Sequence, residues 1–107
     1  MNLKYTISIY MTKNNKAPFI DWLEKLDKTI RYRVKERLDR VRLGNLGDCK
    51  RLSGDILELR LTFGSGYRIY FAEQNQEIIL LLCAGDKSSQ AKDIKKAHHY
   101  WLDYLSR

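Results

Sequence analysis

The feature that most constrains the fold is an uninterrupted apolar run late in the chain, from Ile78 to Ala84. A strand with one face in water alternates apolar and polar residues, whereas a strand covered on both faces is apolar throughout. The run is far too short to cross a membrane. It therefore predicts the central strand of a sheet, with Leu80 and Leu82 in the core.

Three other segments show the alternation of half-buried strands. Apolar residues occupy every second position in residues 5–11, 57–63 and 67–71. This period of two is typical of a strand with one face on the core. Residues 74–76, Gln-Asn-Gln, predict a hairpin turn between the last two strands.

Helical spacing appears in three places. Pro18 suits a first helical turn, where its missing N–H has no partner, and an apolar stripe follows it. Asp27 is the expected N-cap of a second helix over residues 28–42, and a third begins at about Ser89. The predicted order is β-α-α-β-β-β-α, an α+β fold in which a mostly antiparallel sheet packs on helices. At 107 residues the chain is expected to form one domain, 1–107.

Charge narrows the choice of partner. The chain has 20 Lys and Arg against 13 Asp and Glu, a formal net charge of +7. Much of the excess lies in the helix predicted over residues 28–42, where Lys35 and Arg42 are two of the cations expected to bind RNA. A basic helix of this kind favours a polyanion or an acidic protein as partner.

Two short motifs suggest where a phosphate would bind. GSGYRIYF at residues 64–71 and GDKSSQ at residues 85–90 each place a cation beside a glycine turn. Arg68 and Lys87 would emerge from neighbouring strands of one sheet. Such a pair can hold a phosphate without a metal or a cofactor, which favours RNA as the ligand.

Face parity adds further candidates. If Leu59 and Ile69 face the helices, then Arg60, Arg68 and Tyr70 lie on the opposite face of the sheet, because side chains alternate along a strand. Further cations, Lys50 and Arg51, would enter from the loop before Ile56. The alternative interpretation is a solvated face on which Glu58 pairs with Arg60 or Arg68.

Candidates for proton transfer lie near the C-terminus. Asp93, His98, His99 and Tyr100 follow the second motif within one predicted helix. His98 flanks the apolar stripe of that helix, so packing is the favoured interpretation for it. Asp86 is more easily interpreted as a turn residue than as a general base.

Other classes of protein are disfavoured. Cys49 and Cys83 lack metal-site spacing, so neither a zinc site nor a disulfide framework is expected. The N-terminal segment alternates instead of showing the apolar stretch of a signal peptide. We therefore expect a cytoplasmic protein with reduced thiols, no metal, no cofactor and no membrane association.

At these residues the sequence resembles the RelE/ParE toxin superfamily of toxin-antitoxin modules, and most closely its HigB-like branch, the phage-derived Gp49-like addiction module killer proteins. The resemblance covers nearly the whole domain. The segments that carry it, in chain order, are Phe19-x-x-Trp22-Leu23-x-x-Leu26, residues 44–48 (GNLGD), residues 58–60 (ELR), residues 66–71 (GYRIYF), and residues 85–90 (GDKSSQ) with Asp93, Ile94 and Ala97.

The resemblance implies a RelE-like fold and a metal-free endoribonuclease that cuts mRNA, usually on the translating ribosome, and is held inactive by a HigA-like helix-turn-helix antitoxin. Arg68 matches the arginine that contacts the scissile phosphate, and Lys87 takes the place of the basic residue after the last strand. Arg60 matches a strand lysine less securely. A catalytic tyrosine of RelE falls at Asp93 here, which leaves Asp93, His99 and Tyr100 as alternatives for the acid and base.

Two alternatives to RNA cleavage remain within this fold. One is a non-enzymatic ParE-type toxin that acts on DNA gyrase, and the other is a degenerate member that only binds nucleic acid or its antitoxin. The cationic group at Arg60, Arg68 and Lys87 favours cleavage, because inhibition of gyrase does not need clustered phosphate ligands.

Overall fold

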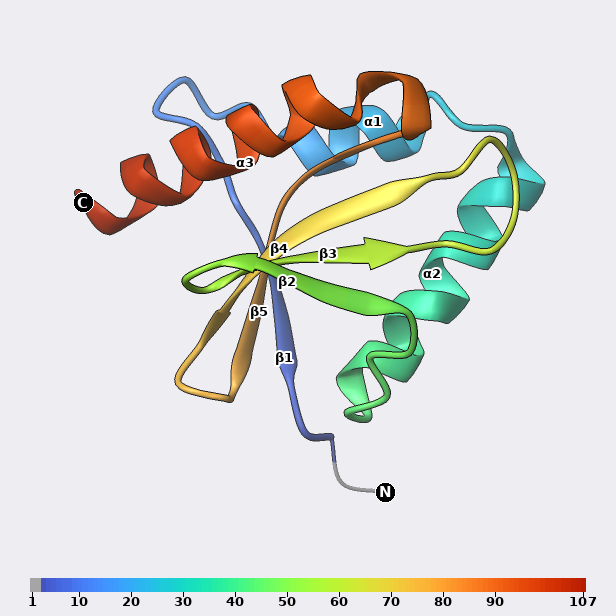
Figure 1. Cartoon of the computed structure of the whole chain (residues 1–107), viewed down its shortest axis with the longest axis horizontal. Helices are drawn as coiled ribbons and strands as arrows, with labels where there is room; N and C mark the ends of the chain where they lie inside the picture. Colours follow the sequence, from blue (N-terminus) through green and yellow to red (C-terminus); the bar gives the residue numbers. More distant parts are fainter. Residues whose placement is uncertain (1–2) are drawn as a thin grey trace.

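The structure is a computed structural model, and it describes residues 3–107. Its elements follow one another along the chain as β1 (Thr6–Ile9), α1 (Pro18–Glu24), α2 (Lys28–Arg42), β2 (Cys49–Ser53), β3 (Ile56–Arg60), β4 (Arg68–Gln74), β5 (Ile78–Gly85), a single 3₁₀ turn η1 (Lys87–Ser89) and α3 (Gln90–Leu105). Figure 1 shows these strands gathered in one sheet with helices around it. The predicted α+β class is confirmed.

The sheet has five strands in the order β1-β5-β4-β3-β2. β1 pairs with β5 in parallel, and the other neighbours are antiparallel. The strand that pairs with β1 is the last one along the chain, because α1, α2 and the strands β2 to β4 come between β1 and β5. The apolar run thus forms an inner strand, as its composition predicts.

One strand was not expected from the sequence. β2 lies where a loop was predicted, and it forms the edge of the sheet beside β3. Lys50, Arg51 and Ser53 are exposed there, so the segment lacks an apolar alternation. Charged, solvated residues are common on edge strands because they discourage pairing with another chain.

Both faces of the sheet are covered. On one face Leu59 and Ile69 pack with Val34 and Leu38 of α2, and α1 adds to the same cluster. On the other face the core is formed with α3, and its members include Tyr70, Leu80, Leu82, Ala97 and Trp101. α3 runs along one side of the strands and α2 lies at another (Figure 1). This arrangement explains why β5 is apolar at successive positions.

The helix boundaries follow the predicted signals. Pro18 occupies the first turn of α1, and the Asp27 carboxylate accepts a hydrogen bond of 3.3 Å from the backbone N–H of Thr29 at the start of α2. α2 ends before Gly44, which has a φ of +94°. Glycine adopts this left-handed conformation at no steric cost. Within residues 3–107, none of the helices combines the length and apolar character needed to span a membrane.

Candidate nucleic-acid interface

The two glycine-turn motifs meet in space. Arg68 of β4 pairs with Gly85 of β5 in the antiparallel register, and Lys87 follows two residues later. A Cβ atom placed on Gly66 would lie 3.3 Å from the Lys87 Cβ and 3.4 Å from Arg68 Nη1. The structure therefore brings Arg68 and Lys87 to the same corner of the sheet, beside the loop between β3 and β4.

This loop holds the Arg68 side chain in place. The loop is closed by a hydrogen bond of 3.0 Å from the Leu61 N–H to the Tyr67 carbonyl. Gly66 has a φ of +75°, a conformation that favours glycine, and its carbonyl accepts a hydrogen bond of 2.8 Å from Arg68 Nη1. The glycine turn thus fixes one edge of the guanidinium group.

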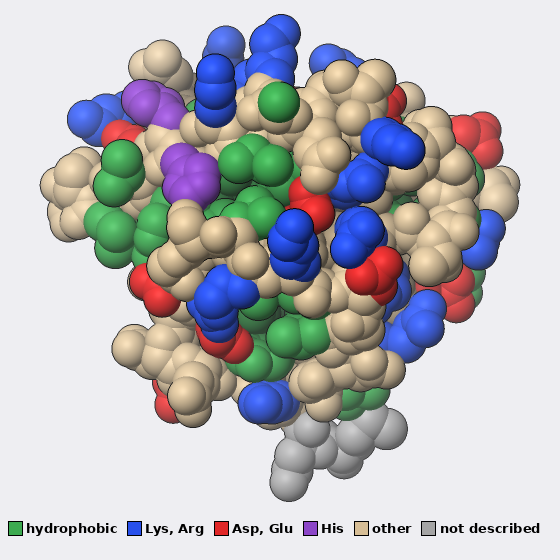
Figure 2. All heavy atoms as spheres, in the orientation of Figure 1, with side chains coloured by type: hydrophobic (Ala, Val, Ile, Leu, Met, Phe, Trp, Pro, Cys, Tyr) green, Lys and Arg blue, Asp and Glu red, His purple; other side chains and the backbone are tan. Residues whose placement is uncertain are grey.

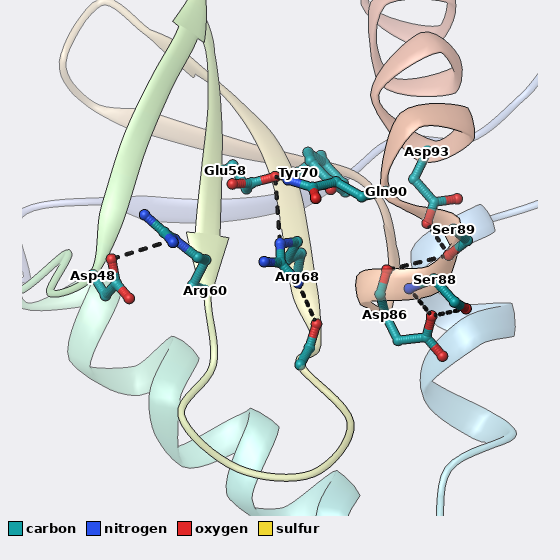
Figure 3. A network of polar contacts seen from close by, with 11 residues as sticks. Asp48, Glu58, Arg60, Arg68, Tyr70, Asp86, Ser88, Ser89, Gln90 and Asp93 are labelled. Carbon is teal, nitrogen blue, oxygen red and sulfur yellow. Dashed lines mark hydrogen bonds and ion pairs between the residues drawn. The ribbon is translucent and has the colours of Figure 1, made fainter.

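A buried carboxylate holds the other side of Arg68. Glu58 is only 2% exposed, and its Oε2 lies 3.7 Å from Arg68 Nε. The same oxygen accepts hydrogen bonds from the Tyr70 hydroxyl, at 3.0 Å, and from Gln90 Nε2, at 2.9 Å. Figure 3 shows these groups converging between β3, β4 and the start of α3. The network offsets much of the cost of burying a carboxylate.

Arg60 and Arg68 differ in their surroundings although they are opposite each other in the β3–β4 register. Arg60 is exposed, and its Nε lies 3.6 Å from Asp48 Oδ1 in a pair open to solvent. The Glu58–Arg68 pair expected under the alternative of a solvated face does form, but it is buried. Arg60 and Lys87 both lie in solvent, whereas Arg68 is largely buried.

The expectation that Tyr70 lies on an open sheet face is wrong. Its side chain is fully buried, at 0% exposure, because α3 covers that part of the sheet. Burial and the hydrogen bond to Glu58 raise the pKa of the Tyr70 hydroxyl far above its ordinary value. Tyr70 supports Glu58 from within the core and has no surface to stack on a base.

Lys50 and Arg51, which were also predicted to bind RNA, lie on opposite faces of the sheet. Lys50 pairs with Glu58 across the strands and so shares the face of Arg68, whereas Arg51 pairs with Leu57 and lies on the opposite face. Arg51 Nη2 lies 3.5 Å from Glu73 Oε1, so the two side chains form an ion pair. Figure 2 shows one side of the whole molecule. Lys and Arg side chains are spread over this surface, with single Asp and Glu side chains between them.

The α2 candidates lie outside this corner. Lys35 is exposed on the helix, and Arg42 at its last turn pairs with Asp39. Neither contacts Arg68 or Lys87 in the structure.

Asp93 lies against the candidate site, at the beginning of α3. It is buried, and its carboxylate accepts a hydrogen bond of 2.6 Å from Ser89 Oγ. A Cβ on Gly85 would lie 1.9 Å from Asp93 Oδ2, so the carboxylate packs directly on the residue that pairs with Arg68. Among the proton-transfer candidates, Asp93 is the one brought to this end of α3.

His99 and Tyr100 lie further along the same helix. Ten residues separate Ser89 from His99, which corresponds to about 15 Å of helix rise. His99 is exposed, while Tyr100 stacks on Tyr10 with ring centroids 5.0 Å apart. Burial raises the pKa of the Tyr100 hydroxyl. The structure does not bring His99 or Tyr100 to the corner of Arg68 and Lys87.

The other two residues considered from the sequence have structural contacts. His98 is half-buried with Nε2 at 3.4 Å from Ser53 Oγ of β2. Asp86 caps η1, where it accepts hydrogen bonds from the Ser88 N–H and hydroxyl. The hydroxyl contact, with the backbone bonds, lowers the pKa of Asp86. Its interpretation as a turn residue agrees with this geometry.

Two features of the site were not predicted. Glu58 was considered only as an exposed ion-pair partner, and Gln90 was given no role, yet together they position Arg68. A signal for Glu58 exists in the sequence, since it shares the strand parity of Tyr70 across the β3–β4 pair. The contact with Gln90 spans 32 residues and has no local signal.

Comparison with solved structures shows that the fold is similar to that of the toxin RelE. The structure superposes on a double mutant of the E. coli toxin RelE in its free state with a TM-score of 0.61, at 18% identity, over 85% of this chain and 93% of that one. The model of the phage-derived protein Gp49-like family, DUF891, matches residues 21–99. The chain belongs to this Gp49-like family.

A curated relative extends the match at the level of sequence. An uncharacterized protein of Haemophilus influenzae is 48% identical over 81 residues, which cover 74% of this chain and 81% of that protein. The Gp49-like affiliation and the RelE-like fold, both expected from the motifs, are confirmed.

Proposed function

We propose that this protein is the toxin of a type II toxin-antitoxin module, of HigB type, and that it is an endoribonuclease that cleaves mRNA on the translating ribosome in the cytoplasm. The observation that carries the proposal is the meeting of Arg68 and Lys87 at one corner of the sheet, where both lie next to Gly66. Membership of the Gp49-like family and the RelE-like fold support it.

The proposed reaction is a transfer within the RNA chain. The ribose 2'-oxygen loses its proton and bonds to the adjacent phosphorus, and the bond from phosphorus to the 5'-oxygen breaks. The 5'-oxygen takes up a proton, so the products are a 2',3'-cyclic phosphate and a 5'-hydroxyl. Two neighbouring cations, Arg68 and Lys87, stabilise the extra negative charge that develops on the phosphate in the transition state.

The site residues divide this work. Arg68 is held by the Gly66 carbonyl and Glu58, which makes it a preorganised guanidinium. Lys87 is exposed and free to approach a phosphate oxygen. Asp93 is the candidate for proton transfer because it lies on Gly85, next to Arg68 in the sheet.

The test is to map 5'-hydroxyl ends on transcripts after induced expression. We expect Arg68→Ala and Lys87→Ala each to lower cleavage on the order of a hundredfold or more, since a lost transition-state contact costs roughly 2 to 4 kcal/mol. Lys16→Ala removes an exposed cation from the loop before α1 and is the matched control. Unchanged cleavage in both site variants would refute the proposal.

The same experiment separates the alternatives. A toxin that acts on DNA gyrase would produce DNA breaks and an SOS response instead of RNA ends, and a degenerate member would produce neither. For the proton, Asp93→Asn should lower cleavage more than His99→Ala or Tyr100→Phe. The reverse order would move the acid or base away from the Arg68 corner.

The proposed protein partner is a HigA-like helix-turn-helix antitoxin, because proteins of this superfamily act in such modules. Co-expression with the product of a small helix-turn-helix gene adjacent to the gene for this protein should restore growth and yield a stable complex. An adjacent helix-turn-helix protein that neither binds nor protects would argue against this part of the proposal.

A further inference from the structure

A second group of arginines lies outside the corner described above. A pocket of about 330 Å³ opens between α2, the loop that follows it and the end of β3. Its charged lining residues are Arg33, Glu36, Arg37, Arg40, Asp48 and Arg60. Four guanidinium groups thus face two carboxylates, and we call this group the arginine pocket.

The pocket has a fixed base. Arg37 is only 8% exposed, and its guanidinium donates to the backbone carbonyls of Asn45, at 3.1 Å, and Leu46. Gly47 closes over it, since a Cβ there would lie 2.1 Å from Arg37 Nη2. The loop after α2 is therefore folded around one charged side chain, which sets the positions of its neighbours.

The charges of the pocket are not balanced. Arg33, Arg37 and Arg40 follow one another at helical spacing on one side of α2. Among the described residues, none of these three has a carboxylate within 4 Å, and Arg60 has only the exposed Asp48. Burial, together with the nearby charge of Arg40, lowers the pKa of Arg37. An anion placed among these groups would relieve this repulsion.

The position of the pocket next to the Arg68 corner indicates which kind of anion it would bind. Arg60 lines the pocket and also stands opposite Arg68 in the β3–β4 register, so this one residue links the pocket to the Arg68 corner. In Figure 3, Asp48, Arg60 and Arg68 follow one another from the pocket side toward the start of α3. A polymer with regularly spaced phosphates could occupy both places at once.

The pocket also contains an aromatic group. Phe63 lines it, and the guanidinium of Arg33 lies 4.2 Å from the centre of the Phe63 ring. A stacked guanidinium plane and an aromatic ring are the surfaces on which proteins hold unpaired bases of single-stranded RNA. An acidic peptide would use the arginines but would gain nothing from this stack.

We infer that the arginine pocket is a second RNA-binding site, which holds the backbone phosphates of a single-stranded RNA next to the nucleotide bound at Arg68 and Lys87. This inference deepens the proposed function and depends on it for the identity of the bound strand. The pocket contributes affinity and register, whereas the Arg68 corner contributes chemistry.

The test is equilibrium binding of a fluorescent RNA oligonucleotide with 2'-deoxy substitutions that prevent cleavage, over a series of salt concentrations. Arg33→Ala and Arg40→Ala should each raise the Kd by about tenfold and reduce the dependence of binding on salt by roughly one phosphate contact. Lys28→Ala removes an exposed cation of α2 outside the pocket and is the control. Circular dichroism of each variant verifies its folding.

Each outcome is decisive. Equal affinities of the pocket variants and Lys28→Ala, or no binding of RNA by the unmodified protein at low salt, would overturn the inference. Loss of antitoxin binding with RNA binding intact would assign the pocket to a protein partner and overturn it as well. Loss of RNA binding without any transcript cleavage by the unmodified protein would support the pocket while refuting the proposed catalysis.

Discussion

At the scale of residues, the buried carboxylate of Glu58 decides what Arg68 can do. A guanidinium held on two sides loses little side-chain entropy when it binds a phosphate. The negative charge of Glu58 already offsets part of the positive charge of Arg68. The exposed Lys87 and Arg60 therefore supply much of the long-range attraction for a phosphate. Positioning and attraction are thus divided between different cations of one corner.

Removal of this carboxylate should destabilise the protein. Glu58→Ala leaves the Tyr70 hydroxyl and Arg68 without their partner in a buried place. We expect a loss of about 3 kcal/mol in the free energy of unfolding. Asp48→Ala removes the equivalent carboxylate from the exposed pair with Arg60 and should cost less than about 1 kcal/mol. Urea denaturation measures both, and equal losses would contradict the buried network.

Gly85 shows a different constraint, one of space. Its backbone needs no special conformation, but a Cβ would lie 1.9 Å from Asp93 Oδ2 and 2.7 Å from Ser89 Oγ. Gly85→Ala should therefore cost roughly 2 kcal/mol through overpacking. In the double variant with Asp93→Ala the closest of these contacts is removed, so the combined loss in urea unfolding should be smaller than the sum of the single losses. Additive losses would show that Asp93 does not pack on Gly85.

At the scale of elements, β5 organises both halves of the core. Leu80 and Leu82 face α3, while Ile79 and Leu81 belong to the cluster with α1 and α2. The strand pairs with β1 on one side and β4 on the other. A substitution that shortens a buried side chain of β5 therefore weakens the packing on both faces of the sheet.

Truncation of this strand gives a direct measurement. Leu80→Ala and Leu82→Ala should each lower the free energy of unfolding by about 2 to 5 kcal/mol, the range for buried leucines. Leu102→Ala on α3 is the control, because that side chain is 66% exposed and should cost well under 1 kcal/mol. If the two β5 variants were as stable as the control, the assignment of β5 to the centre of the core would be wrong.

At the scale of the whole molecule, three tyrosine hydroxyls donate to carboxylates on other elements. Tyr5 donates to Glu73 and Tyr10 to Asp103, each at 2.6 Å, and the Tyr70 hydroxyl donates to Glu58. The first two tie the segments around β1 to β4 and to α3. They lock the first strand onto elements that lie 68 and 93 residues away.

These pairs make stability depend on pH in alkaline solution. The hydrogen bond to Glu73 and burial raise the pKa of Tyr5 to about 12, and burial with the bond to Asp103 does the same for Tyr10, from a usual value of 10.0. Between these values the unfolded chain loses protons that the folded protein keeps. The stabilisation is complete below pH 10.0 and declines as the pH rises toward 12.

Urea midpoints measured across this window should fall with pH. Tyr5→Phe and Tyr10→Phe should be less stable at neutral pH but lose less on alkalinisation, since each removes one of the titrating groups. Tyr32→Phe changes a side chain that is 65% exposed and should leave the slope unchanged. A slope equal in all four proteins would place its origin elsewhere.

Much of the fold was predictable because its signals are local. Alternation indicated β3, β4 and the N-terminal strand, the apolar run indicated β5, and Asp27 indicated the start of α2. β2 was missed because an exposed edge strand has no apolar period to detect. The glycine-turn motifs also indicated the meeting of Arg68 and Lys87, since both are adjacent to paired strands.

By itself, then, the sequence determined the elements, the α+β class and the corner where two cations meet, because periodicity and turn chemistry act over a few residues. Only the tertiary structure decided how each cation is used. It buried Tyr70, paired Arg68 with Glu58 and gathered Arg33, Arg37, Arg40 and Arg60 around one pocket. These outcomes depend on contacts between distant segments, and composition or spacing along the chain contains no measure of such distances.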